Sequence, residues 1–270
     1  MKVTLLSHTP EPEKAVACAA RLCYASVSPD QLLEGMTEQK ASDFVEMLAS
    51  LGHESPIEHA SFTFAVEGVS RSLLAQITRH RIATFSVQSQ RYVSMEDFPY
   101  VTPPAVANNP RAAALFQEAM ERDRAAYDAI SQALYEEAYE ALLAQGLPEK
   151  QAASAARKQA GEDARFVLPN ACTTQFIMTM NARSLLNFFR LRCCRRAQWE
   201  IRELAREMLR LVCEAAPTLF AAAGPACYRG SCGEGKMSCG RSGEVRAEYA
   251  DIHARAEAVC RARRAAGRED

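Results

Sequence analysis

Two long stretches of this 270-residue chain contain no aspartate, glutamate or lysine: residues 68–95 and residues 164–199. Together they hold ten arginines, namely Arg71, Arg79, Arg81, Arg91, Arg165, Arg183, Arg190, Arg192, Arg195 and Arg196. The whole chain has a formal net charge of −1, so its charges are segregated rather than basic overall. A guanidinium stays protonated and grips phosphate or carboxylate oxygens with paired N–H donors, unlike a lysine ammonium. The missing acids therefore indicate pockets for anionic ligands.

Other absences narrow the class of protein. No apolar run approaches the roughly 20 residues that cross a bilayer, and residues 1–10 lack the pattern of an export signal, so we expect a cytoplasmic protein without membrane contact. Ten cysteines without such a signal should be mostly reduced thiols. The near-neutral charge argues against nucleic acid as a partner and favours a small ligand. There is no glycine-rich phosphate loop, and spacing supports no Ser-His-Asp or Cys-His pair.

Hydrophobic periodicity predicts a mixture of strands and helices. Strands are expected at residues 2–6, 61–66 and 172–180, where β-branched and aromatic residues gather or alternate. Helices are expected at 11–24, 40–51, 70–79, 111–145, 149–160, 182–192 and 199–216, with Thr37 and Asn181 as caps and Gly52 as a terminator. Residues 244–266 form either a charged helix or a disordered end. The length allows one large domain or two small ones.

The first candidate site is Arg79-His80-Arg81 together with the segment that ends in Ser89-Gln90-Arg91-Tyr92. Cationic side chains at a helix end, followed by a loop of small and hydroxyl residues, can surround a phosphate. Gln76 lies one helical turn before Arg79 and His80, so we expect all three at one edge. The alternative is a solvated surface cluster, but a surface without partner carboxylates favours a bound anion or a second subunit.

The second candidate site lies on the helix expected at residues 182–192. Arg183, Asn187 and Arg190 fall at i, i+4 and i+7 and share one face. An amphipathic helix with a polar outer side explains the spacing equally well. Arg192 lies about half a turn away from Arg183, so the two should not serve one small pocket from a regular helix.

Two further groups could bind a metal. The loop His53-Glu54-Ser55-Pro56-Ile57-Glu58-His59 offers two imidazoles and two carboxylates, but its irregular spacing favours hydrogen bonding over a metal site. The glycine- and cysteine-rich segment, residues 224–243, holds Cys227, Cys232 and Cys239. With Cys260 or His253 these thiols could bind zinc, although the spacing is unusual and a metal-free or disordered tail is the alternative. We expect no metal.

Arg79-His80-Arg81, seven residues, and then Ser89-Gln90-Arg91-Tyr92 resemble the signature of the flavin-dependent thymidylate synthases. Other segments also resemble this family. They are the loop at 53–59, Gln76, Arg165-Phe-Val-Leu-Pro169, and the blocks from Asn181 to Asn187 and from Arg192 to Ile201. The resemblance covers roughly residues 2–216 in several ordered blocks, which a chance match to one triplet would not give.

This resemblance implies an α/β (α+β) fold, with a mixed sheet flanked by long helices and with FAD and nucleotide sites at the subunit interfaces of a homotetramer. It implies reductive methylation of dUMP to dTMP, with 5,10-methylenetetrahydrofolate as carbon donor and NADPH as reductant of FAD. The hydride comes from the flavin, through which the one-carbon unit passes, so no enzyme nucleophile attacks the pyrimidine. All of these ligands are polyanions, which suits the arginine excess. A catalytic domain would occupy residues 1–220 and an extension residues 221–270.

Carried over by position, the resemblance assigns roles to individual residues. The expected cofactor-binding residues are His53, Ser55, Glu58, Arg79, His80, Arg81, Asn181, Arg183 and Asn187. The expected substrate-binding residues are Gln76, Arg79, Gln88, Ser89, Gln90, Arg91, Arg165 and Arg192. Arg192 matches the arginine that stabilises the ionised N3 of uracil, and is the expected catalytic residue.

One position departs from the family pattern. Val87 stands where many members have a polar ligand contact, so Gln88 or the backbone would have to supply that contact. This departure motivates the alternative function, a nucleotide- and flavin-binding protein of the same fold that lacks turnover.

Overall fold

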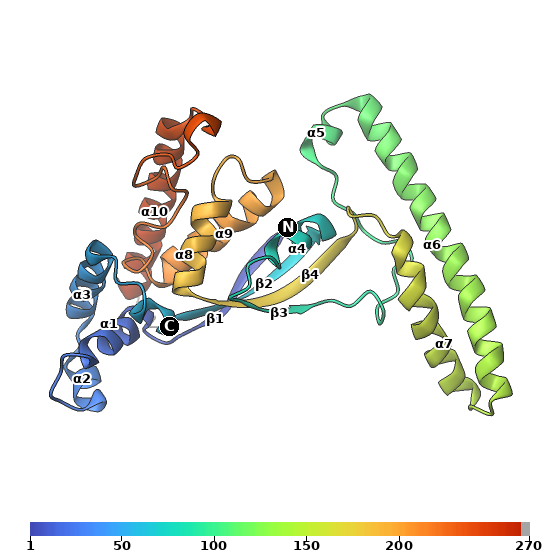
Figure 1. Ribbon diagram of the computed structural model, residues 1–270, viewed down its shortest axis with the longest axis horizontal. Helices are drawn as coiled ribbons and strands as arrows, with labels where there is room; N and C mark the ends of the chain where they lie inside the picture. The colour runs from blue at the N-terminus through green and yellow to red at the C-terminus, as the bar shows by residue number, and fades with distance from the viewer. Residues whose placement is uncertain (266–270) are drawn as a thin grey trace. The chain divides into compact units, whose positions relative to one another are not determined.

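The computed structural model describes residues 1–265 and combines a small β-sheet with many helices (Figure 1). The chain folds into two compact units. Unit 1 comprises residues 1–66, 76–86 and the described residues from 177 onward, and unit 2 comprises residues 67–75 and 87–176. The division falls inside β2 (Ser61–Ser70) and β4 (Thr173–Asn181), each of which begins in one unit and ends in the other.

The sheet has the strand order β1-β2-β4-β3, with β1 at Lys2–His8 and β3 at Thr84–Val87. Thr9 N donates to Ser61 O at 2.9 Å, which sets the end of β1 beside the start of β2. Ala182 N donates to Ala60 O at 2.8 Å, which sets the end of β4 beside the start of β2. The expected mixture of sheet and helices is confirmed, but these pairs are antiparallel where we expected a mixed sheet. Side-chain alternation reports the buried face of a strand and not its direction.

The N-terminal helices of unit 1 are α1 (Pro12–Leu22), α2 (Pro29–Gly35) and α3 (Glu38–Leu51), followed by η1 (Pro56–His59). A small apolar core that includes Leu32 and Ala41 joins the helices. Thr37 caps α3 through its hydroxyl, which accepts from Lys40 N, and Gly52 ends it with a φ of 69°. Both of these predictions are confirmed. Sequence reasoning missed α2.

The C-terminal half of unit 1 contains α8 (Ala182–Arg192), α9 (Trp199–Ala215), η3 (Gly235–Met237) and α10 (Ser242–Ala265). Asn181 caps α8 as predicted, because its Oδ1 accepts from Ser184 N at 2.9 Å. Phe188 and Phe189 of α8 are fully buried, and Phe189 and Phe62 both pack edge-on against Phe220. These rings fix one side of α8 in the core and leave its polar side for ligands. Of the two alternatives for residues 244–266, the charged helix is the one that forms, as α10; residues 266–270 of the 221–270 extension lie outside the described residues.

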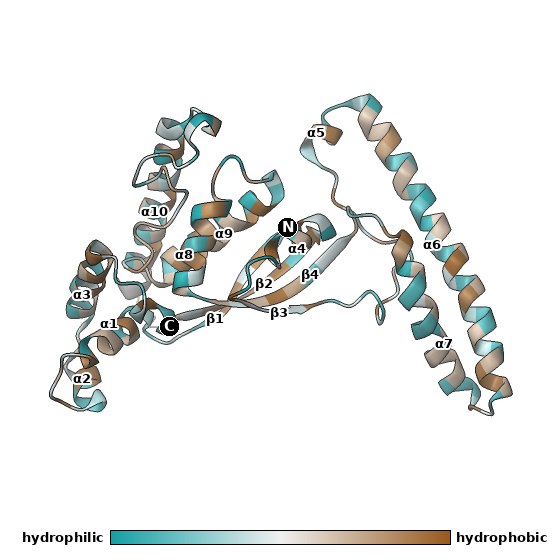
Figure 2. Ribbon diagram, in the orientation of Figure 1, coloured by the Kyte–Doolittle hydropathy of each residue, from teal (hydrophilic) through white to brown (hydrophobic). Residues whose placement is uncertain are grey.

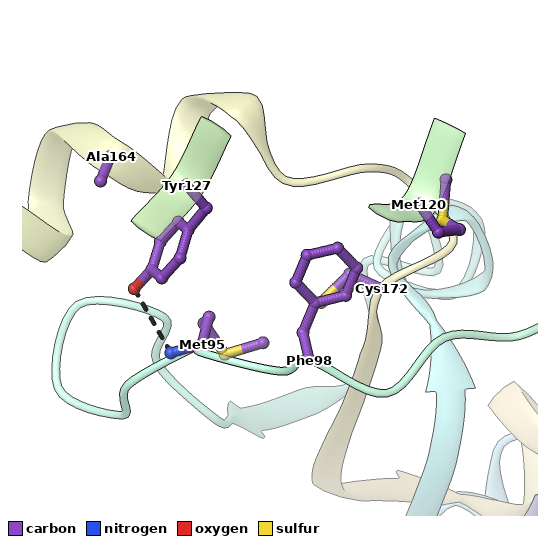
Figure 3. Packing of buried hydrophobic residues seen from close by; sticks show 6 residues of the cluster. All are labelled: Met95, Phe98, Met120, Tyr127, Ala164 and Cys172. Atoms are coloured by element: carbon purple, nitrogen blue, oxygen red, sulfur yellow. Dashed lines mark hydrogen bonds between the residues drawn. The ribbon is translucent and has the colours of Figure 1, made fainter. Parts of the chain in front are cut away.

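Unit 2 is dominated by α6 (Pro110–Ala144) and α7 (Glu149–Ala164), which run beside each other (Figure 1) and are accompanied by α5 (Pro104–Ala107) and η2 (Arg165–Val167). Apolar and polar bands alternate along α6, as an amphipathic helix requires (Figure 2). Tyr127 of α6 accepts from Met95 N at 3.3 Å above a core that includes Phe98 and Cys172 (Figure 3). This packing fixes the loop that follows Ser89-Gln90-Arg91.

The remaining helix, α4, runs from Arg71 to Ile77, two residues short of the expected end. No helix among residues 1–265 has both the length and the apolar character that crossing a bilayer demands.

Candidate functional site

A pocket of about 840 Å³ lies in unit 1 against the polar side of α8. This volume is in the range of small-molecule binding sites, which is about 300–1,000 Å³. The pocket is lined by Glu54, Glu58, Arg79, His80, Arg81, Ile82, Met180, Asn181, Arg183, Ser184, Leu186, Asn187, Arg190, Leu191 and Arg192. It brings together both arginine-rich stretches, and five of their ten arginines line it.

The predicted shared face of α8 is confirmed, because Arg183, Asn187 and Arg190 all line this pocket. The expectation that Arg192 would be kept apart from Arg183 is wrong, since it lines the same pocket. Nine residues of helix separate the two Cα atoms by about 13 Å along the axis. The pocket is long and extends along α8, so residues half a turn apart reach it at different heights with long side chains.

Arg183 is held by two carboxylates. Its Nε donates to Glu54 at 3.1 Å and its Nη1 donates to Glu58 at 2.6 Å. The hydrogen bonds that Arg183 donates to these two carboxylates raise its pKa, and the bond to Glu58 has the larger effect. The stretch around Arg183 lacks acids, but the loop at 53–59 supplies them from elsewhere in the sequence. This pairing aims the guanidinium and reduces its net charge.

Within the described part of the chain, the other four pocket arginines form no ion pair with a carboxylate: Arg79, Arg81, Arg190 and Arg192. Arg190 donates to Asn187 Oδ1 at 3.1 Å. Four cationic groups without carboxylate partners give this pocket a positive electrostatic potential, which favours an anionic ligand.

Arg192 makes its contact with a neutral base. Its Nε donates to His80 Nε2 at 3.1 Å, and because Nε of arginine can only donate, His80 Nε2 must be unprotonated. Burial, and then the positive charge of Arg192, lower the pKa of His80. The His80 ring stands edge-on against Phe188, at a centroid distance of 5.0 Å. The imidazole is thus fixed on one side by the core and on the other by the guanidinium.

A second group of expected ligand residues meets in unit 2. Arg91 Nη1 donates to Glu162 Oε1 at 2.7 Å, and Arg165 Nε donates to the backbone oxygen of Glu162 at 3.1 Å. The hydrogen bond from Arg91 lowers the pKa of Glu162. Gln90 and Arg91 line a pocket of about 990 Å³ with Tyr127, Arg157 and Lys158. The residues expected to bind substrate are therefore gathered partly here and partly in unit 1.

Several expected residues lie outside the pocket on α8. His53 and Ser55 line a different pocket of about 1010 Å³ against α1 and α3. Gln76 does not line the pocket on α8 together with Arg79 and His80. The helix α4 ends at Ile77, so helical spacing no longer places these three residues on one face.

Polar groups of the residues that follow Val87 form hydrogen bonds within the protein. Gln88 N donates to Gln175 O in the sheet, so this backbone donor is not available to a ligand. Ser89 Oγ accepts from Arg91 N at 3.2 Å and so stabilises the turn.

Sequence reasoning missed some residues that line the pocket. Glu54 was visible as a carboxylate in the loop at 53–59, and Arg190 shared a face with Arg183. The apolar residues Ile82, Leu186 and Leu191 carried no chemical signal. Among residues 1–265 no group of three or more His, Cys, Asp or Glu side chains is arranged to hold a metal ion.

The fold and the pocket define an α/β protein with an arginine-lined pocket whose charge and volume suit an anionic small molecule. A sequence model described as "Thymidylate synthase complementing protein" matches residues 4–218. The chain is 53% identical over 249 residues to the flavin-dependent thymidylate synthase of Clostridium tetani, which covers 92% of this chain and 97% of the relative. It is 50% identical over 254 residues to that of Geobacter sulfurreducens, covering 93% and 99%.

The chain therefore belongs to the family of flavin-dependent thymidylate synthases, as its motifs predicted. The family match ends at residue 218, whereas the alignment with the Clostridium tetani protein covers 249 residues. Similarity to that protein therefore continues past the end of the family match.

Proposed function

We propose that this enzyme methylates dUMP to dTMP, with 5,10-methylenetetrahydrofolate as carbon donor and NADPH as reductant of bound FAD. The observation that carries the proposal is the pocket on α8, where Arg79, Arg81, Arg190 and Arg192 lack carboxylate partners among the described residues. The family membership supports the reaction type, since the relatives are named flavin-dependent thymidylate synthases.

The residues of the pocket fit a flavin dinucleotide. Guanidinium groups suit its pyrophosphate, and the amides of Asn181 and Asn187 can bond to polar edges of the ring. Leu186, Leu191 and Ile82 add apolar surface for a flat ring. The bound flavin supplies the redox chemistry, and the protein binds, orients and polarises. We assign cofactor binding to His53, Ser55, Glu58, Arg79, His80, Arg81, Asn181, Arg183 and Asn187.

Arg192 is the proposed catalytic residue. Its Nε is committed to His80, so the guanidinium plane is fixed and both Nη groups remain to donate to the pyrimidine. A fixed cation stabilises negative charge that develops on the uracil ring, and no reorganisation is needed at the moment of reaction. We assign substrate binding to Gln76, Arg79, Gln88, Ser89, Gln90, Arg91, Arg165 and Arg192.

We also propose an oligomeric state and a cellular location for the enzyme. A homotetramer with active sites at its subunit interfaces explains why expected ligand residues are distributed over separate pockets of one chain. We place the enzyme in the cytoplasm, with a catalytic domain at residues 1–220 and an extension at 221–270.

The test is formation of dTMP by the purified protein supplied with FAD, NADPH, methylenetetrahydrofolate and dUMP, followed by chromatography. Formation of dTMP that stops when NADPH, methylenetetrahydrofolate or dUMP is omitted, or when the bound flavin is removed from the protein, supports the proposal. The alternative, a protein that binds nucleotide and flavin without turnover, is motivated by Val87. Tight dUMP binding without dTMP would establish that alternative.

A further inference from the structure

A second arginine-lined pocket, of about 440 Å³, lies in unit 1 and shares no residue with the pocket on α8. It is lined by Cys193, Arg195, Arg202, Arg206, Cys239, Arg241, Glu248 and Tyr249. Its walls come from the C-terminal end of α8 and the segment after it, from α9, from the segment that leads into α10, and from α10 itself. Cys193 directly follows Arg192.

The charges at this pocket do not balance. Arg195 pairs with Glu244 at 3.0 Å and with Glu248 at 3.5 Å, and Arg206 pairs with the same Glu248 at 3.0 Å. Among the described residues, Arg202 donates to a neutral acceptor alone, the backbone oxygen of Arg195, at 2.9 Å. Arg241 forms no ion pair within residues 1–265. Four guanidinium groups thus face two carboxylates, which leaves two positive charges for a ligand to neutralise.

The other wall groups do not supply the missing negative charge. Burial raises the pKa of Cys193 to about 12, so this thiol stays neutral at physiological pH. The hydroxyl of Tyr249 donates to Cys193 O at 3.1 Å and is therefore committed to the protein. Glu248 is shared between two arginines. An anion that enters the pocket meets donors and only one partly neutralised carboxylate.

The donors are also held in place. Arg202 and Arg206 stand at i and i+4 and share one face of α9. The ion pair of Arg206 with Glu248 joins α9 to α10, and that of Arg195 joins the segment between α8 and α9 to α10. The buried hydroxyl of Tyr249 joins α10 to the end of α8. Arg241 directly precedes α10, whose N-terminal dipole adds to the positive potential. Forked donors held in fixed positions favour tetrahedral phosphate oxygens over a mobile counter-ion.

We propose that this pocket is a second anion site, which binds a phosphate or pyrophosphate group carried by a small molecule. The site goes beyond the proposed function, because dUMP and FAD are assigned to other residues. Arg202 and Arg241 are the main ligands, and the paired Arg195 and Arg206 complete the ring of donors.

The test uses the FAD-loaded protein saturated with dUMP and titrated with pyrophosphate by calorimetry in a phosphate-free buffer. The wild type should bind one additional pyrophosphate per protomer. The double substitution Arg202→Gln with Arg241→Gln should weaken this binding at least about ten-fold, because it removes two charged hydrogen-bond donors. The matched control is Arg255→Gln with Arg261→Gln, which removes two exposed charges of α10 away from the pocket. It should leave pyrophosphate affinity unchanged.

Three results would overturn the proposal: no additional pyrophosphate, equal weakening in both double variants, or tighter binding of triglutamate than of pyrophosphate. The last result would assign the pocket to carboxylates instead. If the Arg202/Arg241 variant fails to fold, protection of both arginines from phenylglyoxal by pyrophosphate in the wild type replaces it, and lack of protection contradicts the site. The dUMP titration that precedes each experiment tests the proposed function separately.

Discussion

Arg192 Nε donates to His80 Nε2 across 3.1 Å, which links residues that are 112 positions apart in the sequence. The bond needs a neutral imidazole, and burial together with the charge of Arg192 keeps the pKa of His80 low. Protonation of His80 would leave two cationic groups face to face. The orientation of the proposed catalytic guanidinium therefore depends on the protonation state of one histidine.

This relationship predicts an acid limit to activity. The pKa of His80 is depressed in the folded protein, so the acid limb of kcat/KM for dUMP should lie below the ordinary histidine value of about 6.5. His80→Asn keeps an acceptor for Arg192 but cannot titrate, so it should retain part of the activity and lose this limb. His80→Phe should lose both the remaining activity and the acid limb. An unchanged acid limb in the asparagine variant would show that another group controls it.

The same shift predicts how stability depends on pH. As pH falls below about 6.5, the unfolded chain takes up a proton at His80 before the folded protein does, so the free energy of unfolding decreases. His80→Asn should make that decrease smaller. Urea unfolding at several pH values between 7 and 5 measures the effect. His253, whose pKa is also lowered by burial, should keep contributing in the variant.

Arg192 and Arg183 line one pocket but should have different roles. Arg192→Ala should lower kcat by about 10²–10³, the loss typical of one donor that stabilises developing charge, and should leave FAD retention nearly intact. Arg183→Ala should lower FAD retention and leave kcat nearly intact. Rapid-quench turnover and the ratio of flavin to protein after gel filtration measure the two effects. If both variants only lose stability, with normal activity per folded molecule, α8 has a structural role alone.

Much of the local structure was readable from the sequence. Asn181 and the apolar spacing after it located α8 at residues 182–192, because capping and periodicity are local properties. The helix α2 was missed although Ser28 and Gln31 form a reciprocal capping box. The contacts that shape the site were not readable in this way. Arg183 with Glu54, and Arg192 with His80, join distant segments, and no local rule encodes such pairs.

Glu58 should matter for flavin retention more than for stability. Glu58 and Arg183 are both exposed, and exposed ion pairs contribute little to folding. Glu58→Gln should therefore leave the melting temperature nearly unchanged while it alters FAD affinity, because Arg183 loses one of its two positioning acceptors. Glu46→Gln removes an exposed carboxylate of α3 outside this pocket and serves as the control. A large fall in melting temperature in the Glu58 variant alone would contradict this view.

Tyr249 should link α10 to the end of α8. Tyr249→Phe removes the hydrogen bond to Cys193 O and should lower the free energy of unfolding by about 0.5–1.5 kcal/mol. Because Cys193 follows Arg192, the variant should also lower kcat modestly. Tyr24→Phe, at an exposed tyrosine, is the matched control for stability and should leave the free energy of unfolding unchanged.

The visible absorption spectrum of the purified protein tests the central claim most directly, that arginines without carboxylate partners converge on a pocket for flavin and nucleotide. The account predicts a flavin spectrum that shifts when dUMP is added to the wild type, and a colourless preparation when Arg79 and Arg81 are both replaced by alanine. A wild-type protein that is colourless after incubation with FAD and removal of the unbound FAD would contradict it.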